Sequence, residues 1–180
     1  MIIAGVDEVG RGSLAGPVTA AAVILKNPIS ELKDSKEISP PRREILSEII
    51  KEQSFYSFAS ISNAKIDEIN IHQATLLAMQ EAIMNLPITP DLVYVDGKFT
   101  PNIEVNCKAV IGGDKLISEI SAASIIAKVH RDDFMKELDK KFPIYDFAKN
   151  KGYGTAYHLA ALRKSGYTSI HRQSFKGVIV

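Results

Sequence analysis

Residues 2–12, Ile-Ile-Ala-Gly-Val-Asp-Glu-Val-Gly-Arg-Gly, place two adjacent acids at the end of an apolar run and a glycine-rich turn directly after them. The run 2–7 is apolar on both faces, and so is the run 18–25 that follows the turn. Strands of this kind belong in the interior of a sheet that is covered on both sides. The two runs therefore predict neighbouring strands of an α/β protein, with Asp7 and Glu8 at the end of the first.

Other segments of the chain alternate between strand and helix patterns. The short apolar or alternating runs that predict strands are residues 55–61, 92–95 and 103–111. The segments with helical spacing of apolar residues are 41–52, 71–86, 116–142 and 155–165. In the last strand run Cys107 falls on the apolar face, which predicts a small buried side chain. The pattern indicates a mixed α/β domain without an internal repeat or a flexible linker.

The longest predicted helix, 116–142, carries two further signals. Residues 121–124 are Ser-Ala-Ala-Ser, which predicts a helix face for close packing against a neighbour. The apolar period of this segment also allows a break at residues 132–133, where two aspartates are adjacent.

Length and composition describe one globular domain. The 180 residues are 46% hydrophobic, which is ordinary for a soluble protein. The single cysteine, Cys107, excludes an internal disulfide and a multi-cysteine zinc site, and this fits a reducing compartment. Residues 1–7 lack the features of a signal peptide, and no apolar run reaches the roughly 20 residues of a membrane span. We therefore expect a cytoplasmic protein that does not act at a membrane.

The charge is unevenly distributed along the chain. The formal net charge is +1, but residues 140–180 hold eight basic residues against one acid, Asp146, which leaves −6 for the rest of the chain. An acidic body with a basic C-terminal segment suggests that one region binds a polyanion and the other binds cations. The alternative is a solvated charged surface without a ligand.

Two more acids stand where secondary structure elements begin or end. Asp96 ends the apolar run 92–95 and is followed by Gly97, and Asp114 follows two glycines and opens the long predicted helix. Because the ends of neighbouring strands in an α/β sheet converge on one crevice, these acids could meet Asp7 and Glu8 there. Each also has an ordinary alternative, since Asp114 suits a helix N-cap and Asp-Gly suits a turn.

Clustered carboxylates need a compensating partner. Two unit charges about 4 Å apart repel by roughly 4 kcal/mol at an effective dielectric constant of 20. Shared protons or hard divalent cations can offset this repulsion. The four histidines stand apart in the sequence and show no ligand spacing, which disfavours zinc, and no Walker loop, nucleophile elbow or dinucleotide motif is present. Magnesium or manganese between carboxylates and a phosphate is the chemistry that remains.

An ordered series of motifs runs along almost the whole chain. The motifs are residues 7–12, 14–18, 34–36, 69–71, 74–79, 95–97, 113–114, 121–129, 131–132, 152–155 with 158, and 171–172 with 174–175. In this order they resemble type 2 ribonuclease H, the ribonuclease HII family. The type 3 relatives vary the Gly-Arg-Gly element, whereas this chain keeps Arg11, which favours type 2.

The resemblance implies a ribonuclease H-like α/β fold, with a mixed five-stranded sheet flanked by helices and a C-terminal helical extension. It implies a catalytic domain over residues 1–142 and a basic, helical, substrate-binding segment over 143–180 that packs on it. The family's catalytic and metal-binding carboxylates map onto four acids of this chain. They are Asp7, Glu8, Asp96 and Asp114, the same acids that the residue patterns select. The rival pair at 132–133 is assigned to a helix-surface or structural role.

The resemblance also implies substrate contacts. In the family, the Gly-Arg-Gly motif, here Gly10, Arg11 and Gly12, lies against the ribonucleotide and its 2′-hydroxyl. Tyr153 resembles the tyrosine that stacks on the sugar beyond the ribonucleotide, and Lys36 resembles a lysine that contacts phosphate. Glycines let the backbone approach a ligand closely, and the 2′-hydroxyl separates RNA from DNA. From the residues alone, Tyr153 would instead be a loop aromatic packed on its own domain.

The implied function is endonucleolytic hydrolysis on the 5′ side of a ribonucleotide in duplex DNA or in RNA–DNA hybrids. It uses two divalent cations, Mg²⁺ or Mn²⁺, leaves 3′-hydroxyl and 5′-phosphate ends, and belongs to ribonucleotide excision repair. We expect a monomer without an obligate protein partner. The alternatives are a resolvase-like nuclease on the same fold and a non-catalytic nucleic-acid-binding module.

Overall fold

A computed structural model describes the side chains of residues 1–33 and 37–180, so the predicted phosphate contact of Lys36 lies outside the described residues. One five-stranded mixed sheet forms the centre of the molecule, in the order β3-β2-β1-β4-β5. The strands are β1 (Ile3–Val9), β2 (Val18–Leu25), β3 (Ser54–Ile61), β4 (Leu92–Asp96) and β5 (Asn106–Val110). The pairs β1–β2 and β2–β3 are antiparallel, and β1–β4 and β4–β5 are parallel. The predicted pairing of the first two strands is confirmed.

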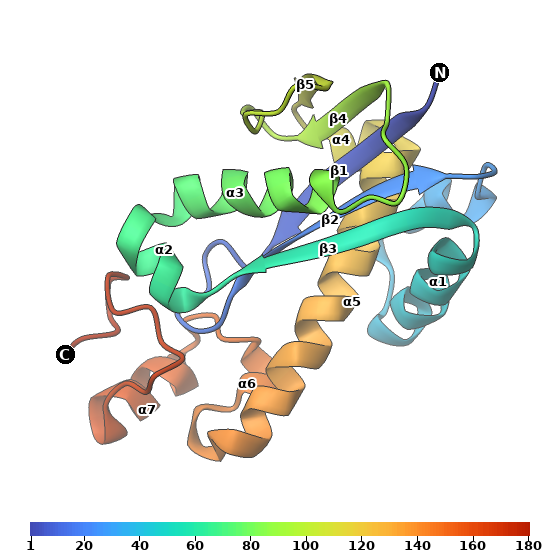
Figure 1. Ribbon diagram of the computed structural model, residues 1–180. Coiled ribbons are helices and arrows are strands. Elements are labelled where there is room, and N and C mark those ends of the chain that lie inside the picture. The colour runs from blue at the N-terminus through green and yellow to red at the C-terminus, as the bar shows by residue number, and fades with distance from the viewer.

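Helices cover both faces of this sheet (Figure 1). The α-helices are α1 (Pro40–Glu52), α2 (Asn63–Ile69), α3 (Ile71–Met84), α4 (Gly113–Leu116), α5 (Ser118–Lys141), α6 (Phe147–Asn150) and α7 (Ala156–Ser165). Two 3-10 helices, η1 (Ser30–Glu37) and η2 (Pro143–Tyr145), connect them. The predicted mixed five-stranded sheet flanked by helices is confirmed.

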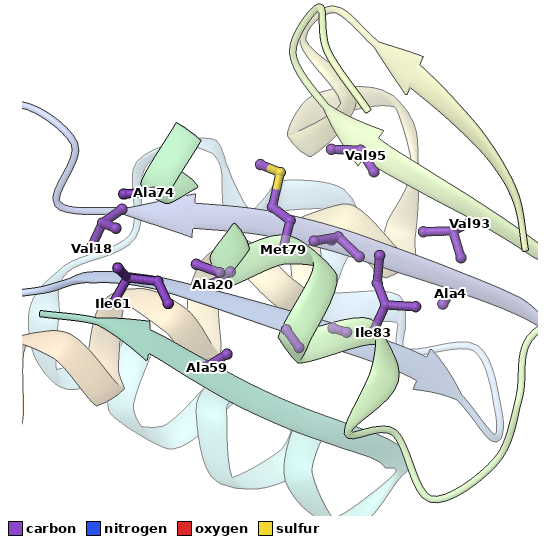
Figure 2. Packing of buried hydrophobic residues seen from close by; sticks show 14 of the residues in the cluster. Ala4, Val18, Ala20, Ala59, Ile61, Ala74, Met79, Ile83, Val93 and Val95 are labelled. Carbon is purple, nitrogen blue, oxygen red and sulfur yellow. The ribbon is translucent and has the colours of Figure 1, made fainter. Parts of the chain in front are cut away.

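The face covered by α3 holds the larger hydrophobic core (Figure 2). Alternate residues of the three central strands, such as Ala20 on β2 and Val93 on β4, point into it and meet Met79 and Ile83 of α3. Small strand residues let this helix approach the sheet closely, and the side chains of α3 fill the remaining space.

The opposite face packs against α5 at very short distance. A Cβ added to Gly5 of β1 would lie 2.2 Å from the carbonyl carbon of Glu119 and 2.3 Å from the backbone nitrogen of Ile120. Ser121, Ala122 and Ala123 are buried, as expected for the small-residue face of the long helix. This contact fixes the position of β1 relative to the start of α5.

Three details differ from the sequence prediction. The long helix is interrupted at Ile117, the extended residue between α4 and α5, and it continues without a break through 132–133. Cys107 is only half-buried and Ile111 is 69% exposed, because β5 is a short strand at the edge of the sheet. The helix α2 was not predicted, although Ser62 caps it by accepting a hydrogen bond from the backbone nitrogen of Lys65.

The segment after α5 folds back against the end of that helix and the turn between β1 and β2. Its core consists of Leu14, Ala15, Met135, Leu138, Tyr145, Phe147, Leu162 and Val178. Ala15 also forms an isolated antiparallel bridge with His171. The C-terminal segment is thereby tied to the turn that follows the paired acids. Within the described residues no helix is long and apolar enough to cross a membrane.

Candidate active site

The paired acids lie in the last part of β1. Asp7 pairs with Ala21 of β2 across the sheet and is only 6% exposed, while Glu8 is half-buried. The Oδ1 atom of Asp7 accepts a hydrogen bond of 2.8 Å from the backbone nitrogen of Glu8. Both acids therefore belong to the central strand of the sheet and not to a solvated loop.

The register between β1 and β4 brings Asp96 beside this pair. Val6 pairs with Val95 in parallel register, so the next residues along the two strands, Asp7 and Asp96, project from neighbouring positions on one face. The predicted meeting of the two strand ends is confirmed by this register.

Asp114 belongs to α4 and lies beside Asp96. Its backbone nitrogen donates to the Oδ1 atom of Asp96 over 3.3 Å. Gly112 is the N-cap of α4, in left-handed conformation, and Asp114 lies in the first turn. The alternative that Asp114 is a helix N-cap is therefore wrong.

Burial and mutual repulsion raise the pKa of two of these acids, Asp7 and Asp96. Desolvation raises the pKa of Asp7 well above its ordinary value, and the charges of Glu8 and Asp96 raise it further. Burial is also the largest cause that raises the pKa of Asp96. A hydrogen bond from the backbone of Asp114 lowers this pKa, and the charge of Asp114 raises it again. The four carboxylates therefore interact as neighbours in one electrostatic unit.

Nothing among the described side chains neutralises this unit. Among residues 1–33 and 37–180, no ion pair within 4 Å includes any of the four acids. The buried Oε2 atom of Glu8 has no hydrogen-bond partner in this part of the chain. Within the described residues no three His, Cys, Asp or Glu side chains are already arranged around a common point for a metal ion. The acids form a chain of neighbours and not a closed ligand shell.

Two cavities meet at Glu8. The larger, about 580 Å³, lies between η1, α1 and the start of α5, and it contains Glu8 and Asp114. Its wall also carries four cationic side chains that the sequence analysis did not select. They are Lys33, Arg43, Lys115 and Lys128, against one further acid, Glu37. Lys128 is also paired with Asp132. The smaller, about 70 Å³, contains Glu8, Arg11 and Asp96. The acids thus separate a cationic groove from a small pocket.

The Gly-Arg-Gly turn forms part of the rim of the small pocket. Arg11 and Gly12 are exposed, and Gly10 is buried with φ at +89°. A Cβ added to Gly12 would lie 3.8 Å from the ring of Tyr153. The structure therefore brings Tyr153 next to the Gly-Arg-Gly turn although it follows Gly12 by 141 positions in the sequence.

Sequence analysis missed two buried arginines beneath this turn. Arg131 and Arg172 are fully buried and bind only backbone carbonyl groups. Arg172 had been counted in the basic C-terminal charge, so part of that charge is not at the surface. The residue pattern carries no signal of this burial, since Arg131 is followed directly by Asp132 and Asp133, as a surface arginine could be.

Two histidines that stand apart in the sequence form a pair in the fold. The Nε2 atoms of His158 and His171 are 2.9 Å apart, and both side chains are buried. Desolvation lowers the pKa of both histidines. The pKa of His171 falls to about 4, and the neighbouring His158 is the second cause of this shift.

The expected structural role of the aspartates at 132–133 agrees with their ion pairs to Lys128 and Lys136.

A mixed five-stranded sheet of this order, flanked by helices and with acids at the ends of its two central parallel strands, defines the ribonuclease H-like class of α/β enzymes. The chain belongs to the ribonuclease HII family, whose model matches residues 4–178. It is 54% identical over 179 residues to ribonuclease HII of Borrelia hermsii (strain HS1 / DAH), covering 97% of this chain and 99% of that relative.

Solved structures agree with this assignment. Ribonuclease H2 from Pyrococcus horikoshii OT3 has a TM-score of 0.85 and 26% identity, covering 99% of this chain and 95% of that chain. A chain of the PCNA:RNase HII complex from Archaeoglobus fulgidus has a TM-score of 0.83 and 26% identity, covering 98% and 96%. The protein is thus a ribonuclease H-type hydrolase, an endoribonuclease.

Proposed function

We propose that this ribonuclease hydrolyses the phosphodiester bond on the 5′ side of a ribonucleotide in duplex DNA or in an RNA–DNA hybrid, and leaves 3′-hydroxyl and 5′-phosphate ends. The observation that carries the proposal is the row of four neighbouring carboxylates, which form no ion pair with any described side chain, beside the Gly-Arg-Gly turn. The catalytic acids are Asp7, Glu8, Asp96 and Asp114.

These acids suit two divalent cations, Mg²⁺ or Mn²⁺. Carboxylate oxygens are the donors that hard cations take, and the buried Oε2 of Glu8, which has no hydrogen-bond partner among the described residues, is available as a ligand atom. Bound divalent cations supply Lewis acidity, which activates water and stabilises charge on the leaving oxygen. Four carboxylates and two dications sum to zero charge, so a phosphate can enter the neutralised site.

The surrounding residues hold the substrate. Arg11 can bind phosphate oxygens in a forked geometry, and the backbone of Gly10 and Gly12 allows a close approach to the 2′-hydroxyl. Tyr153 stacks on the sugar that follows the ribonucleotide. Lys36, whose side chain is not described, contacts a phosphate.

The cationic groove and the C-terminal segment bind the rest of the duplex backbone. The groove wall carries four cationic side chains next to Glu8 and Asp114, which suits a polyanionic strand that passes the acids. We divide the chain into a catalytic domain, 1–142, and a substrate-binding segment, 143–180. Binding of duplex then weakens as salt increases, because the bound backbone releases counterions.

The cellular setting follows from this substrate. An enzyme that cuts at single ribonucleotides in DNA serves ribonucleotide excision repair, and we propose that it acts in the cytoplasm. The Archaeoglobus relative was solved together with PCNA. For the present chain we propose a monomer that cuts without an obligate protein partner, and cleavage by the purified chain alone tests this.

One gel experiment tests the proposed function. The substrates are a duplex with one ribonucleotide, an RNA–DNA hybrid and an all-DNA branched duplex, each incubated with Mg²⁺, with Mn²⁺ and with a chelator. We expect one cut on the 5′ side of the ribonucleotide, only with metal. Cleavage of the branched DNA alone would indicate a resolvase-like nuclease, and binding without any product would indicate a non-catalytic module.

A further inference from the structure

The side chain of Arg172 binds the turn between β1 and β2 through three hydrogen bonds. Its Nε donates to the carbonyl oxygen of Gly16 (3.0 Å), its Nη1 to that of Arg11 (2.8 Å) and its Nη2 to that of Gly10 (2.6 Å). The side chain of Arg172 is completely buried, and its guanidinium carbon lies 5.0 Å from the centre of the Phe175 ring. One guanidinium thus fixes three carbonyl groups in the turn that includes the Gly-Arg-Gly motif.

Arg131 makes the matching set of bonds between this turn and the segment that carries Tyr153. Its Nε donates to Pro17 (2.9 Å), its Nη2 to Ala15 (3.1 Å) and its Nη1 to Lys151 (2.8 Å), all at carbonyl oxygens. The guanidinium carbon lies 5.8 Å from the centre of the Tyr153 ring. Gly10 packs directly on this side chain, since an added Cβ would meet the Nε of Arg131 at 2.2 Å.

Neither arginine forms an ion pair within 4 Å among the described residues, and the charges of Asp132 and Asp67 offset their burial only in part. Burying a charge without an opposite charge is costly, and a neutral side chain could fill a structural site at lower cost. Burial therefore lowers the pKa of Arg172 to about 9, with the charge of Arg131 as the second cause. Two positive charges of this kind favour a negatively charged group directly above them.

The bonds also set the direction of the turn's peptide groups. The carbonyls of Gly10 and Arg11 point down to Arg172, and in the part of the chain that the structure describes the backbone nitrogens of Arg11 and Gly12 have no acceptor. A backbone that turns its oxygens inward presents donors at the surface, which suits a phosphate or a hydroxyl oxygen.

We propose that Arg131 and Arg172 are positioning residues that fix the distance between the Gly-Arg-Gly turn and Tyr153, and thereby determine which phosphodiester bond is cut. The proposal rests on the proposed function. The two arginines do not touch the substrate. They act through the carbonyls of the turn and of Lys151, two residues before the tyrosine.

The test is the cutting pattern of a duplex that contains four consecutive ribonucleotides in one DNA strand. The wild-type enzyme cuts at one preferred position, because the turn and Tyr153 contact adjacent nucleotides together. The variants are Arg131→Lys and Arg172→Lys, which keep the charge but lose the three-way bonding. We expect cuts to spread to neighbouring bonds, and kcat/KM on a single ribonucleotide to fall by about tenfold or more, the loss expected for one or two hydrogen bonds at the recognition site.

Ile50→Ala is the matched control, because Ile50 is buried between α1 and α5 and away from the turn. At equal distance below its melting temperature it should keep the wild-type cutting pattern, whereas a lysine variant of similar stability should not. If both lysine variants fail to fold, the cutting pattern of Ser13→Ala tests the positioning role in their place. Its Oγ donates to Ala15 (2.8 Å) and Lys151 (3.2 Å) and so links the same two segments without a charge.

A wild-type cutting pattern in the folded lysine variants, or in Ser13→Ala where it decides, would overturn the positioning role. Absence of any cut by the wild-type enzyme would instead refute the proposed function, so the two failures are distinguishable.

Discussion

Replacing His171 by Gln should remove much of the acid sensitivity of folding. The hydrogen bonds of the His158–His171 pair run in one direction. The backbone nitrogen of Thr168 donates to Nδ1 of His171 (3.0 Å), so that atom carries no proton and the proton of His171 lies on Nε2. This N–H donates to Nε2 of His158, whose own Nδ1–H donates to the carbonyl oxygen of Tyr153 (2.9 Å). A further proton on either ring turns a hydrogen bond into a contact between two donors.

The magnitude follows from the lowered pKa of His171. Its ordinary value is 6.5, and burial with the adjacent His158 lowers it to about 4. Between these two values the unfolded chain binds more protons than the folded chain, so the free energy of unfolding falls as the pH falls from 6.5 to 4 and levels off below that. At 1.36 kcal/mol per pKa unit the loss is about 3 kcal/mol in order of magnitude.

The assay is urea unfolding of the wild-type protein and of His171→Gln at pH 7.5 and 4.5. The glutamine amide can accept from Thr168 and donate to His158, but it does not titrate. Because the acids with raised pKa values contribute an opposite trend in both proteins, the quantity to compare is the difference between the two pH dependences. We expect the wild-type protein to lose about 2–3 kcal/mol more than the variant over this interval. Equal losses in both proteins would refute the proposed proton arrangement of the pair.

Three further changes probe the site and its support. Asp96→Asn should abolish cleavage, leave duplex binding largely intact and raise the urea midpoint of the metal-free protein, because it removes repulsion while keeping the acceptor for Asp114; near-normal turnover would exclude Asp96 from catalysis. Arg11→Ala should reduce the preference for a ribonucleotide without changing the melting temperature, since Arg11 is exposed; unchanged selectivity would remove it from recognition. Gly5→Ala should destabilise the protein by about 3 kcal/mol, because its Cβ overlaps the backbone of α5, and an unchanged urea midpoint would contradict that contact.

The sequence predicted the sheet and the meeting of the acids for a physical reason. Short runs such as 18–25 that are apolar on both faces indicate interior strands, and the ends of neighbouring strands converge, so the pattern allowed Asp7 and Asp96 to meet, as the register shows. The interruption at Ile117 was not predictable, because residues 116–142 keep one apolar period across it. Cys107 was predicted to be buried because alternation reveals which face is apolar but not whether the strand lies at the sheet edge.

The support of the turn was invisible for a different reason. Arginine is among the residues that are least often buried, so Arg131 and Arg172 read as surface charge in a sequence. Their carbonyl partners lie 114 or more residues away for five of the six bonds, and backbone acceptors leave no trace in residue identity. The histidine pair is similarly hidden, since 13 residues separate two side chains that only the loop at 168–171 brings together.

The paired acids and the recognition turn are mechanically one element, because only Val9 separates Glu8 from Gly10. β1 is held at Gly5 by the backbone of α5, and the turn after it is held by Arg131, which is itself a residue of α5. The same helix therefore fixes both the acids that hold metal and the turn that meets the ribose. A displacement of α5 moves the two sites together, whereas a change at Arg172, which belongs to the C-terminal segment, moves the turn alone. Substitutions of Arg131 and Arg172, whose side chains bind the turn and not the acids, should consequently change ribonucleotide selection, whereas a displacement of the whole of α5 should change metal binding as well.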